Sequence, residues 1–209
     1  MPPLRTLSAA RVAEILAGDG LVVDLRPIDT YLAAHIRGSV PLLYEAGPGL
    51  GGRARDLLPL DARLIVLDDG ASPLDRAVDS FRGKGFEVVG AVAGDPETWP
   101  GGPVATPVVA LTDAPGTLAL IDVADPGTVV PSEYGVGARI PAELLWDRAG
   151  ELGRTMQLGV LAGWGVRAAA AVGILEKLGF SSVTFVRTRP AGQVPPMAGA
   201  AVFRAGGPP

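Results

Sequence analysis

The chain of 209 residues contains 29 glycines and 20 prolines, together just under the roughly 25–30% at which low complexity becomes the default interpretation. Its 48% of hydrophobic residues are enough for packed cores, and its length suits one large domain or two small ones. Because it has no cysteine and a single histidine, His35, it offers no disulfide framework, no thiol nucleophile and no multi-histidine metal site. We expect neither a metal nor a cofactor.

The charge balance also excludes some partners. With 18 basic and 22 acidic residues, the chain has no dominant positive charge for binding nucleic acid or an anionic membrane. Arg167 interrupts the most apolar region, so no uncharged stretch reaches the roughly 18 residues of a membrane span. Residues 1–18 mix Arg and Glu into a helical pattern and lack the apolar core of a signal peptide. We therefore expect a cytoplasmic protein.

The first half of the chain alternates between helix and strand patterns. Ser8 is a candidate N-cap for a helix with apolar positions Val12, Ile15 and Leu16, and a buried strand over 21–24 follows. The next predicted elements are a strand over 63–67, a helix from Ser72–Pro73 to about Lys84, and a strand over 86–89. This alternation is typical of βαβ units and a mainly parallel sheet.

The second half repeats the same order. Its predicted elements are a strand over 118–123, a helix over 142–152, a strand over 157–161, a helix over 166–178 and a strand over 182–186. Asp24 and Asp122, like Pro41 and Pro141, are separated by about 100 residues. We infer two tandem copies of one α/β unit, at 1–104 and 105–209. Each is predicted to form a mainly parallel sheet of about five strands with helices on both faces.

The boundary between the copies is predicted from composition. Residues 94–108 contain four prolines and several glycines and are expected to form a hinge. The tail after residue 187 is too rich in proline and glycine for a regular element.

Several segments of the first copy resemble the signature of rhodanese domains. In that family a D-x-R sequence is followed by an acidic–aromatic pair and a G-H-I-x-G-A turn. The matching residues here are Asp24, Arg26, Asp29, Tyr31, His35 and Gly38. Residues 95–104 resemble the closing segment of the family, and the second copy keeps a weaker resemblance at 121–123 and 138–144. The resemblance implies a tandem rhodanese.

The resemblance also implies a chemistry that this chain has lost. Rhodaneses transfer a sulfane sulfur through a persulfide on a cysteine, which begins a C-x-x-G-x-R loop between a strand and a helix. In the second copy this loop is 162–167, where Gly165 and Arg167 remain but Ala162 stands at the cysteine position. In the first copy it is 68–73, with Asp68 at the cysteine position and Pro73 at that of the arginine. Neither loop can carry a persulfide.

Each loop has a functional and a structural interpretation. Backbone N–H groups at a helix N-terminus, together with a guanidinium, suit an oxyanion. The candidate anion site is Gly163, Trp164, Gly165, Val166 and Arg167, although Arg167 equally suits a structural ion pair. Trp164 could anchor a partner, but packing is the favoured role. Asp68 and Asp69 could serve acid–base or metal chemistry, whereas capping of the following turn is more usual at a strand end.

The remaining motif residues, Asp24, Arg26, Tyr31, His35 and Gly38, are expected to be structural. We expect His35 to hydrogen-bond to Asp24 or to the backbone, and Arg26 to form a structural ion pair.

Two classes of function follow. The first is a non-catalytic rhodanese-like protein that acts as an interaction, regulatory or anion-binding module, with a protein or a small oxyanion as partner. The second is an enzyme, either a sulfurtransferase that uses a partner's thiol or a hydrolase or phosphatase with Asp68 as nucleophile. We favour the first class, because carboxylates in the first loop repel an anionic substrate and the second loop has no nucleophile.

Overall fold

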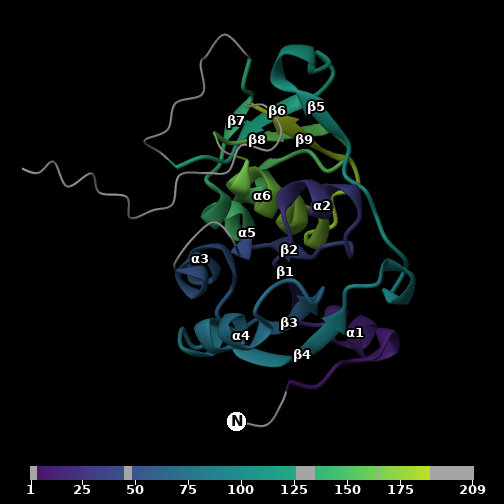
Figure 1. Ribbon diagram of the computed structural model, residues 1–209. Helices are drawn as coiled ribbons and strands as arrows, with labels where there is room; N and C mark the ends of the chain where they lie inside the picture. Colours follow the sequence, from purple (N-terminus) through teal and green to yellow (C-terminus); the bar gives the residue numbers. More distant parts are fainter. Residues whose placement is uncertain (1–3, 45–48, 126–134, 164, 189–209) are drawn as a thin grey trace, which may run out of the picture.

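The computed structural model describes residues 4–44, 49–125, 135–163 and 165–188, and it contains two separate β-sheets with helices packed around them (Figure 1). Every pairing between the strands of these sheets is parallel. The predicted α/β class with mainly parallel sheets is therefore confirmed.

The first sheet has four strands, where about five were predicted. The elements of this half are α1 (Ala9–Leu16), β1 (Gly20–Asp24), α2 (Ile28–Ala33), β2 (Val40–Pro41), α3 (Leu50–Leu57), β3 (Arg63–Asp68), α4 (Leu74–Arg82), β4 (Glu87–Ala93) and the 3-10 turn η2 (Pro96–Thr98). The strand order is β2-β1-β3-β4. As predicted, Ser8 caps α1, because its hydroxyl oxygen accepts the N–H of Arg11 at 3.3 Å.

The second sheet has five strands, in the order β5-β9-β8-β6-β7. Its half comprises β5 (Val108–Ala110), η3 (Leu111–Asp113), β6 (Ala119–Asp122), β7 (Ala138–Arg139), η5 (Ala142–Leu144), α5 (Leu145–Arg148), η6 (Ala149–Glu151), β8 (Leu158–Leu161), α6 (Val166–Lys177) and β9 (Val183–Arg187). The helix predicted over 142–152 is broken into 3-10, α and 3-10 turns. Gly150 disfavours a continuous helix there by about 1 kcal/mol relative to alanine.

The two sheets share a strand order. The sequence β2-β1-β3-β4 of the first sheet corresponds to β7-β6-β8-β9 of the second, and β5 is an additional edge strand beside β9. In the first half, Thr6 forms a single parallel bridge with Ala91 of β4, at the place that corresponds to β5. The N–H of Leu7 donates to the Ala91 carbonyl at 2.8 Å, and the Ala91 N–H donates to that of Arg5 at 2.9 Å.

The helices cover the two sheets differently. Residues of α1 pack on one face of the first sheet with Val22, Ile65 and Val92, while α3 and α4 pack on the other face with the main core. In the second sheet the described residues place α5 and α6 on the face toward the first half (Figure 1). Its opposite face carries a small apolar cluster that includes Leu111 of η3. Pro115 and Gly116 disfavour a helix at this point of the chain.

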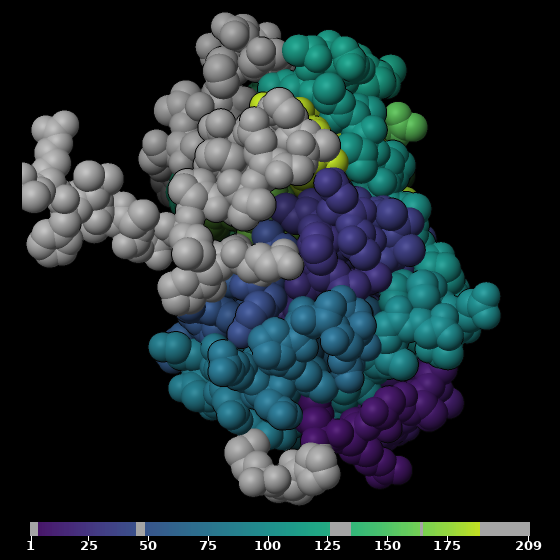
Figure 2. Space-filling model, in the orientation of Figure 1, coloured from purple at the N-terminus to yellow at the C-terminus, as the bar shows by residue number. Residues whose placement is uncertain are grey.

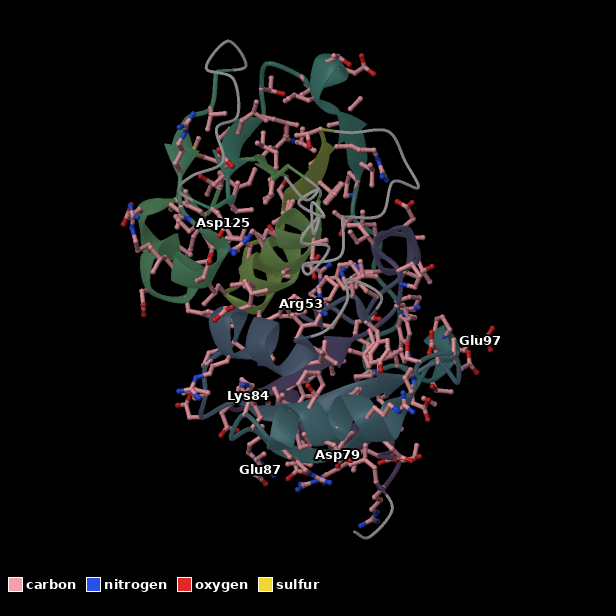
Figure 3. All side chains as sticks on the ribbon, turned by 60° about the vertical axis from the view of Figure 1, so that its left-hand side comes forward. Arg53, Asp79, Lys84, Glu87, Glu97 and Asp125 are labelled. Carbon is pink, nitrogen blue, oxygen red and sulfur yellow. The ribbon has the colours of Figure 1, made fainter. Side chains whose placement is uncertain are left out.

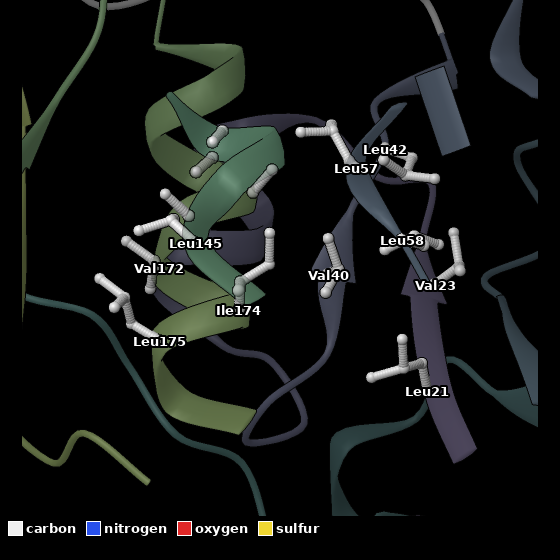
Figure 4. Packing of buried hydrophobic residues seen from close by; sticks show 14 of the residues in the cluster. Leu21, Val23, Val40, Leu42, Leu57, Leu58, Leu145, Val172, Ile174 and Leu175 are labelled. Carbon is white, nitrogen blue, oxygen red and sulfur yellow. The ribbon is translucent and has the colours of Figure 1, made fainter. Parts of the chain in front are cut away.

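Helix α6 lies between the two sheets and belongs to the core of both halves. Eight consecutive residues, 168–175, are buried, so the helix is enclosed on all sides. Figure 4 shows Ile174 of α6 facing Val40 of β2, with Leu145 of α5 beside it. The closest approach is at Gly173, where an added Cβ would lie 1.9 Å from the Ser39 carbonyl oxygen. Only glycine fits there without a shift of one half.

The segment predicted as a hinge is packed against the first half. Val104 and His35 exchange two backbone hydrogen bonds of 2.9 Å, and the N–H of Thr106 donates to the Leu32 carbonyl at 2.9 Å. Trp99 is buried, and its indole N–H donates to the Ala93 carbonyl at 2.8 Å. The chain is therefore attached to the first half as far as Thr106.

Polar contacts add to the packing between the halves. The indole N–H of Trp146 donates to the Leu57 carbonyl at 2.7 Å, and the Lys177 ammonium donates to the Leu16 carbonyl at 2.7 Å. On the face shown in Figure 2, the surface of the first half continues directly into that of the second.

Within the described ranges, no helix combines the length and apolar character needed to cross a bilayer.

Replacing Gly173 with alanine tests the close approach of α6. Alanine favours a helix by about 1 kcal/mol over glycine, but here its methyl group would meet the Ser39 carbonyl oxygen. We expect G173A to lower the free energy of unfolding by about 1–3 kcal/mol, measured by urea denaturation. The control is G52A in α3, where no atom lies within 4 Å of the new Cβ; it should stabilise the protein. Stabilisation by both variants would contradict the packing.

Candidate functional site

Both predicted loops lie where a strand ends and a helix begins. The first connects β3 to α4, and the second connects β8 to α6. In parallel sheets the carboxyl ends of the strands are the usual place for ligand sites. Both loops therefore stand where an oxyanion or a nucleophile would be expected.

The first loop is closed by its own aspartates. The Asp68 carboxylate accepts the N–H of Gly70 at 3.1 Å. The Asp69 carboxylate accepts the N–H groups of Ala71 at 3.0 Å and Ser72 at 3.3 Å. These are the backbone donors that an anion would need, and here they cap a turn. The arrangement matches the structural interpretation of the two residues.

In the described part of the second loop, Ala162 and Gly165 are buried and Gly163, Val166 and Arg167 are partly buried. Gly165 has φ +85°, which favours glycine, and its N–H donates to the Ala162 carbonyl at 2.9 Å. A Cβ on Gly165 would also lie 3.0 Å from the Phe185 ring. The Thr188 hydroxyl donates to the Gly163 carbonyl at 2.7 Å, and Ala162 is only 3% exposed. Of the predicted anion site, Val166 begins α6, and Trp164 lies outside the described residues.

Arg167 stands in the first turn of α6 and is held by two carboxylates. Its Nη2 lies 2.6 Å from Asp125 Oδ1, and its Nη1 lies 2.5 Å from Glu143 Oε2. The second contact is an ion pair without the alignment of a hydrogen bond. Two carboxylates around one guanidinium leave a net negative charge, which opposes an incoming anion. Asp125 belongs to the second half, well away from the labelled charged residues Asp79 and Lys84 of the first (Figure 3).

Asp24 and Arg26 form a buried pair. The Arg26 guanidinium donates to both oxygens of Asp24 at 2.7–3.1 Å and to the Ala34 carbonyl at 2.7 Å. It also lies over the Trp99 ring, with its central carbon 5.1 Å from the ring centroid. The arrangement joins the motif to the segment that leads into the second half.

His35 has a different partner from the expected Asp24. Its Nε2 lies 3.0 Å from Glu176 Oε2 of α6, and its Nδ1 lies 3.0 Å from the Tyr31 carbonyl oxygen. Asp24 is engaged by Arg26, which explains why it is not available to the imidazole. The same Glu176 oxygen accepts the N–H of Gly38 at 3.0 Å. The backbone contact was among the expected ones, while Glu176 was not.

Sequence patterns gave no signal for the residues that complete these contacts. Glu176 lies 141 positions from His35. Asp125 lies in the loop after β6 and Glu143 lies in η5, whereas Arg167 belongs to α6. Each is an ordinary acidic residue in its local context. Among the residues that the structure describes, no three His, Cys, Asp or Glu side chains come together in a group that could hold a metal ion.

Comparisons with known proteins find matches among solved structures. No protein-family model and no curated protein matches the chain. Among solved structures it is similar to the 3-mercaptopyruvate sulfotransferase SseA from Escherichia coli, whose structure is described as having the "Rhodanese" fold. The similarity covers 88% of this chain and 98% of that chain, with 21% identity and a TM-score of 0.38.

Tyr31 links this region to the stability of the protein at high pH. Burial raises the pKa of its phenol well above the ordinary value, and the carboxylates of Glu176 and Asp24 raise it further. The unfolded chain loses this proton near pH 10, while the folded protein keeps it. The free energy of unfolding should therefore fall as the pH rises above about 10.

The variant Y31F isolates this contribution. It removes the titrating hydroxyl group and its 2.7 Å hydrogen bond to the Ser39 carbonyl. This loss should lower the free energy of unfolding by about 1 kcal/mol at neutral pH. Urea denaturation between about pH 9 and 11 should then show a decline shallower than that of the wild type by up to about 1.4 kcal/mol per pH unit. Y44F is the matched control and should keep the wild-type decline. Equal slopes in Y31F and the wild type would refute the assignment.

Proposed function

We propose that this chain is a tandem rhodanese-like protein without sulfurtransferase activity, which acts as an interaction or regulatory module. Two independent features support the tandem relationship. The motif residues of the first copy resemble the rhodanese signature, and the two sheets share one strand order. The proposed domains are 1–104 and 105–209.

The observation that carries the proposal is that, in the part of each strand–helix loop that the structure describes, groups that could hold an anion are already paired within the chain. Asp69 takes two N–H groups of the first loop. In the second loop Arg167 is held by Asp125 and Glu143. With no cysteine anywhere in the 209 residues, neither loop has a group that can form a persulfide.

The enzymatic alternatives fit the geometry less well. A thiol supplied by a partner would have to reach the position of Ala162, which is 3% exposed. Asp68 as a nucleophile would have to leave the N–H of Gly70, and Asp69 beside it would repel a phosphate. Binding of a free oxyanion by Arg167 would require it to exchange two carboxylates for one anion. A protein partner requires none of these changes.

A sulfurtransferase assay tests the absence of activity. We expect the purified protein to transfer no sulfur from thiosulfate or 3-mercaptopyruvate to cyanide or a thiol above the rate of the uncatalysed reaction, because no residue can hold the sulfur. A cysteine-containing rhodanese serves as the positive control. Reproducible turnover by protein of confirmed mass would overturn the proposal. Capture of partners from the source organism, with unfolded protein as control, then tests the interaction.

Thermal denaturation in sulfate tests the state of the second loop. We expect sulfate to raise the melting temperature of the wild type no more than chloride at equal ionic strength, because Arg167 is already paired. In the double variant D125N/E143Q the guanidinium is released, and sulfate should stabilise the protein in proportion to its binding. D29N, which removes a carboxylate from Arg187, is the matched control and should respond like the wild type. Sulfate-specific stabilisation of the wild type would instead favour the anion-binding role.

A further inference from the structure

The His35 ring lies between two hydrogen-bond acceptors. On one side Nδ1 faces the backbone carbonyl oxygen of Tyr31, and on the other Nε2 faces Glu176 Oε2, each at 3.0 Å. The Tyr31 ring stacks on the imidazole, with 4.2 Å between the ring centroids. The His35 side chain is fully buried, so water cannot supply a different partner. Both ring nitrogens therefore depend on these two contacts.

The number of protons on the ring follows from these acceptors. A neutral imidazole has one N–H donor and one lone pair. A carbonyl oxygen can only accept, so the contact with Tyr31 requires a proton on Nδ1. In a neutral ring the lone pair of Nε2 would then face a carboxylate oxygen that already accepts the N–H of Gly38. Two lone pairs at 3.0 Å repel, whereas a second N–H removes the conflict.

The surroundings of Glu176 also favour a positively charged partner for its carboxylate. Its side chain is 9% exposed and stands in the last turn of α6, where the helix dipole disfavours a negative charge. A buried carboxylate is strongly destabilising unless it is paired. The neighbouring charged groups have other partners: Arg26 is bound to Asp24, and the Lys177 ammonium donates to the carbonyls of Leu16 and Gly18. Among the described contacts of the Glu176 carboxylate, the imidazole is the group that can become positive.

We infer that His35 is an imidazolium in the folded protein and forms with Glu176 a buried ion pair that joins the two halves. His35 follows α2 in the first half and Glu176 belongs to α6 of the second, so the proton is held at the interface between the sheets. The phenol of Tyr31 stays neutral and donates to the Ser39 carbonyl, and it does not compete for the proton. The interface thus holds one proton that a neutral histidine would lack.

The single histidine of the chain makes a direct test practical. In protein labelled with ¹⁵N-histidine and freed of any tag, the two ring nitrogens are the only imidazole signals. At about pH 8 free histidine, with a pKa of about 6.5, is almost wholly neutral. We expect both nitrogens of His35 to show an attached proton at this pH. A signal from one unprotonated nitrogen, including the case in which Glu176 holds the proton instead, would overturn the inference.

Two variants separate the pair from the general environment of the interface. In E176Q the side-chain amide can donate as well as accept, so the ring should become neutral at about pH 8 with a single N–H. In D29N the exposed ion pair with Arg187 across the same interface is lost, and His35 should keep both protons. A doubly protonated ring in E176Q would contradict the role of Glu176. If E176Q does not fold, the wild-type spectrum still decides the inference.

Discussion

Helix α6 can lie between the two sheets only because the residues of its central turns are small where it meets the first half. Four consecutive alanines are followed by Val172 and Gly173, and the chain of the first half passes so close to Gly173 that a methyl group would collide with its backbone. Burial of each larger apolar side chain contributes about 1.5–3 kcal/mol. The two sheets therefore share a core through this helix, and the polar contacts of its last turn are fixed by that packing.

The position of α6 also determines what its first turn can do. Phe185 packs against Gly165, and the Thr188 hydroxyl donates to the carbonyl of Gly163, so both glycines are held by contacts at the end of β9. A positive side chain is unfavourable at a helix N-terminus, and Arg167 is stabilised there by Asp125 and Glu143. These ion pairs stabilise the first turn of α6, and they occupy the guanidinium that an external anion would need.

Local patterns predicted most of the elements, because strands of the buried sheets are apolar runs and α1, α4 and α6 begin at recognisable positions. They missed α2, α3 and β5, and also β2 and β7, which are only two residues long. They merged η5, α5 and η6 into one helix. Composition suggested a hinge over 94–108, whereas Trp99 and Val104 bind this segment to the first half. The partners of His35 and Arg167 could not be predicted, since they depend on which face of which element meets another after folding.

In both strand–helix loops, polar groups that could bind an anion are paired within the chain, but the paired groups differ. In a loop that serves a ligand, backbone N–H groups and a basic side chain converge on the position of that ligand. Here the carboxylate of Asp69 accepts two N–H groups of the first loop. In the second loop the Arg167 side chain is paired with the carboxylates of Asp125 and Glu143. Both arrangements satisfy polar groups within the chain and lower the free energy of the folded state without a ligand. The contacts of Asp69 and Arg167 at the two strand–helix junctions are therefore made without a bound substrate.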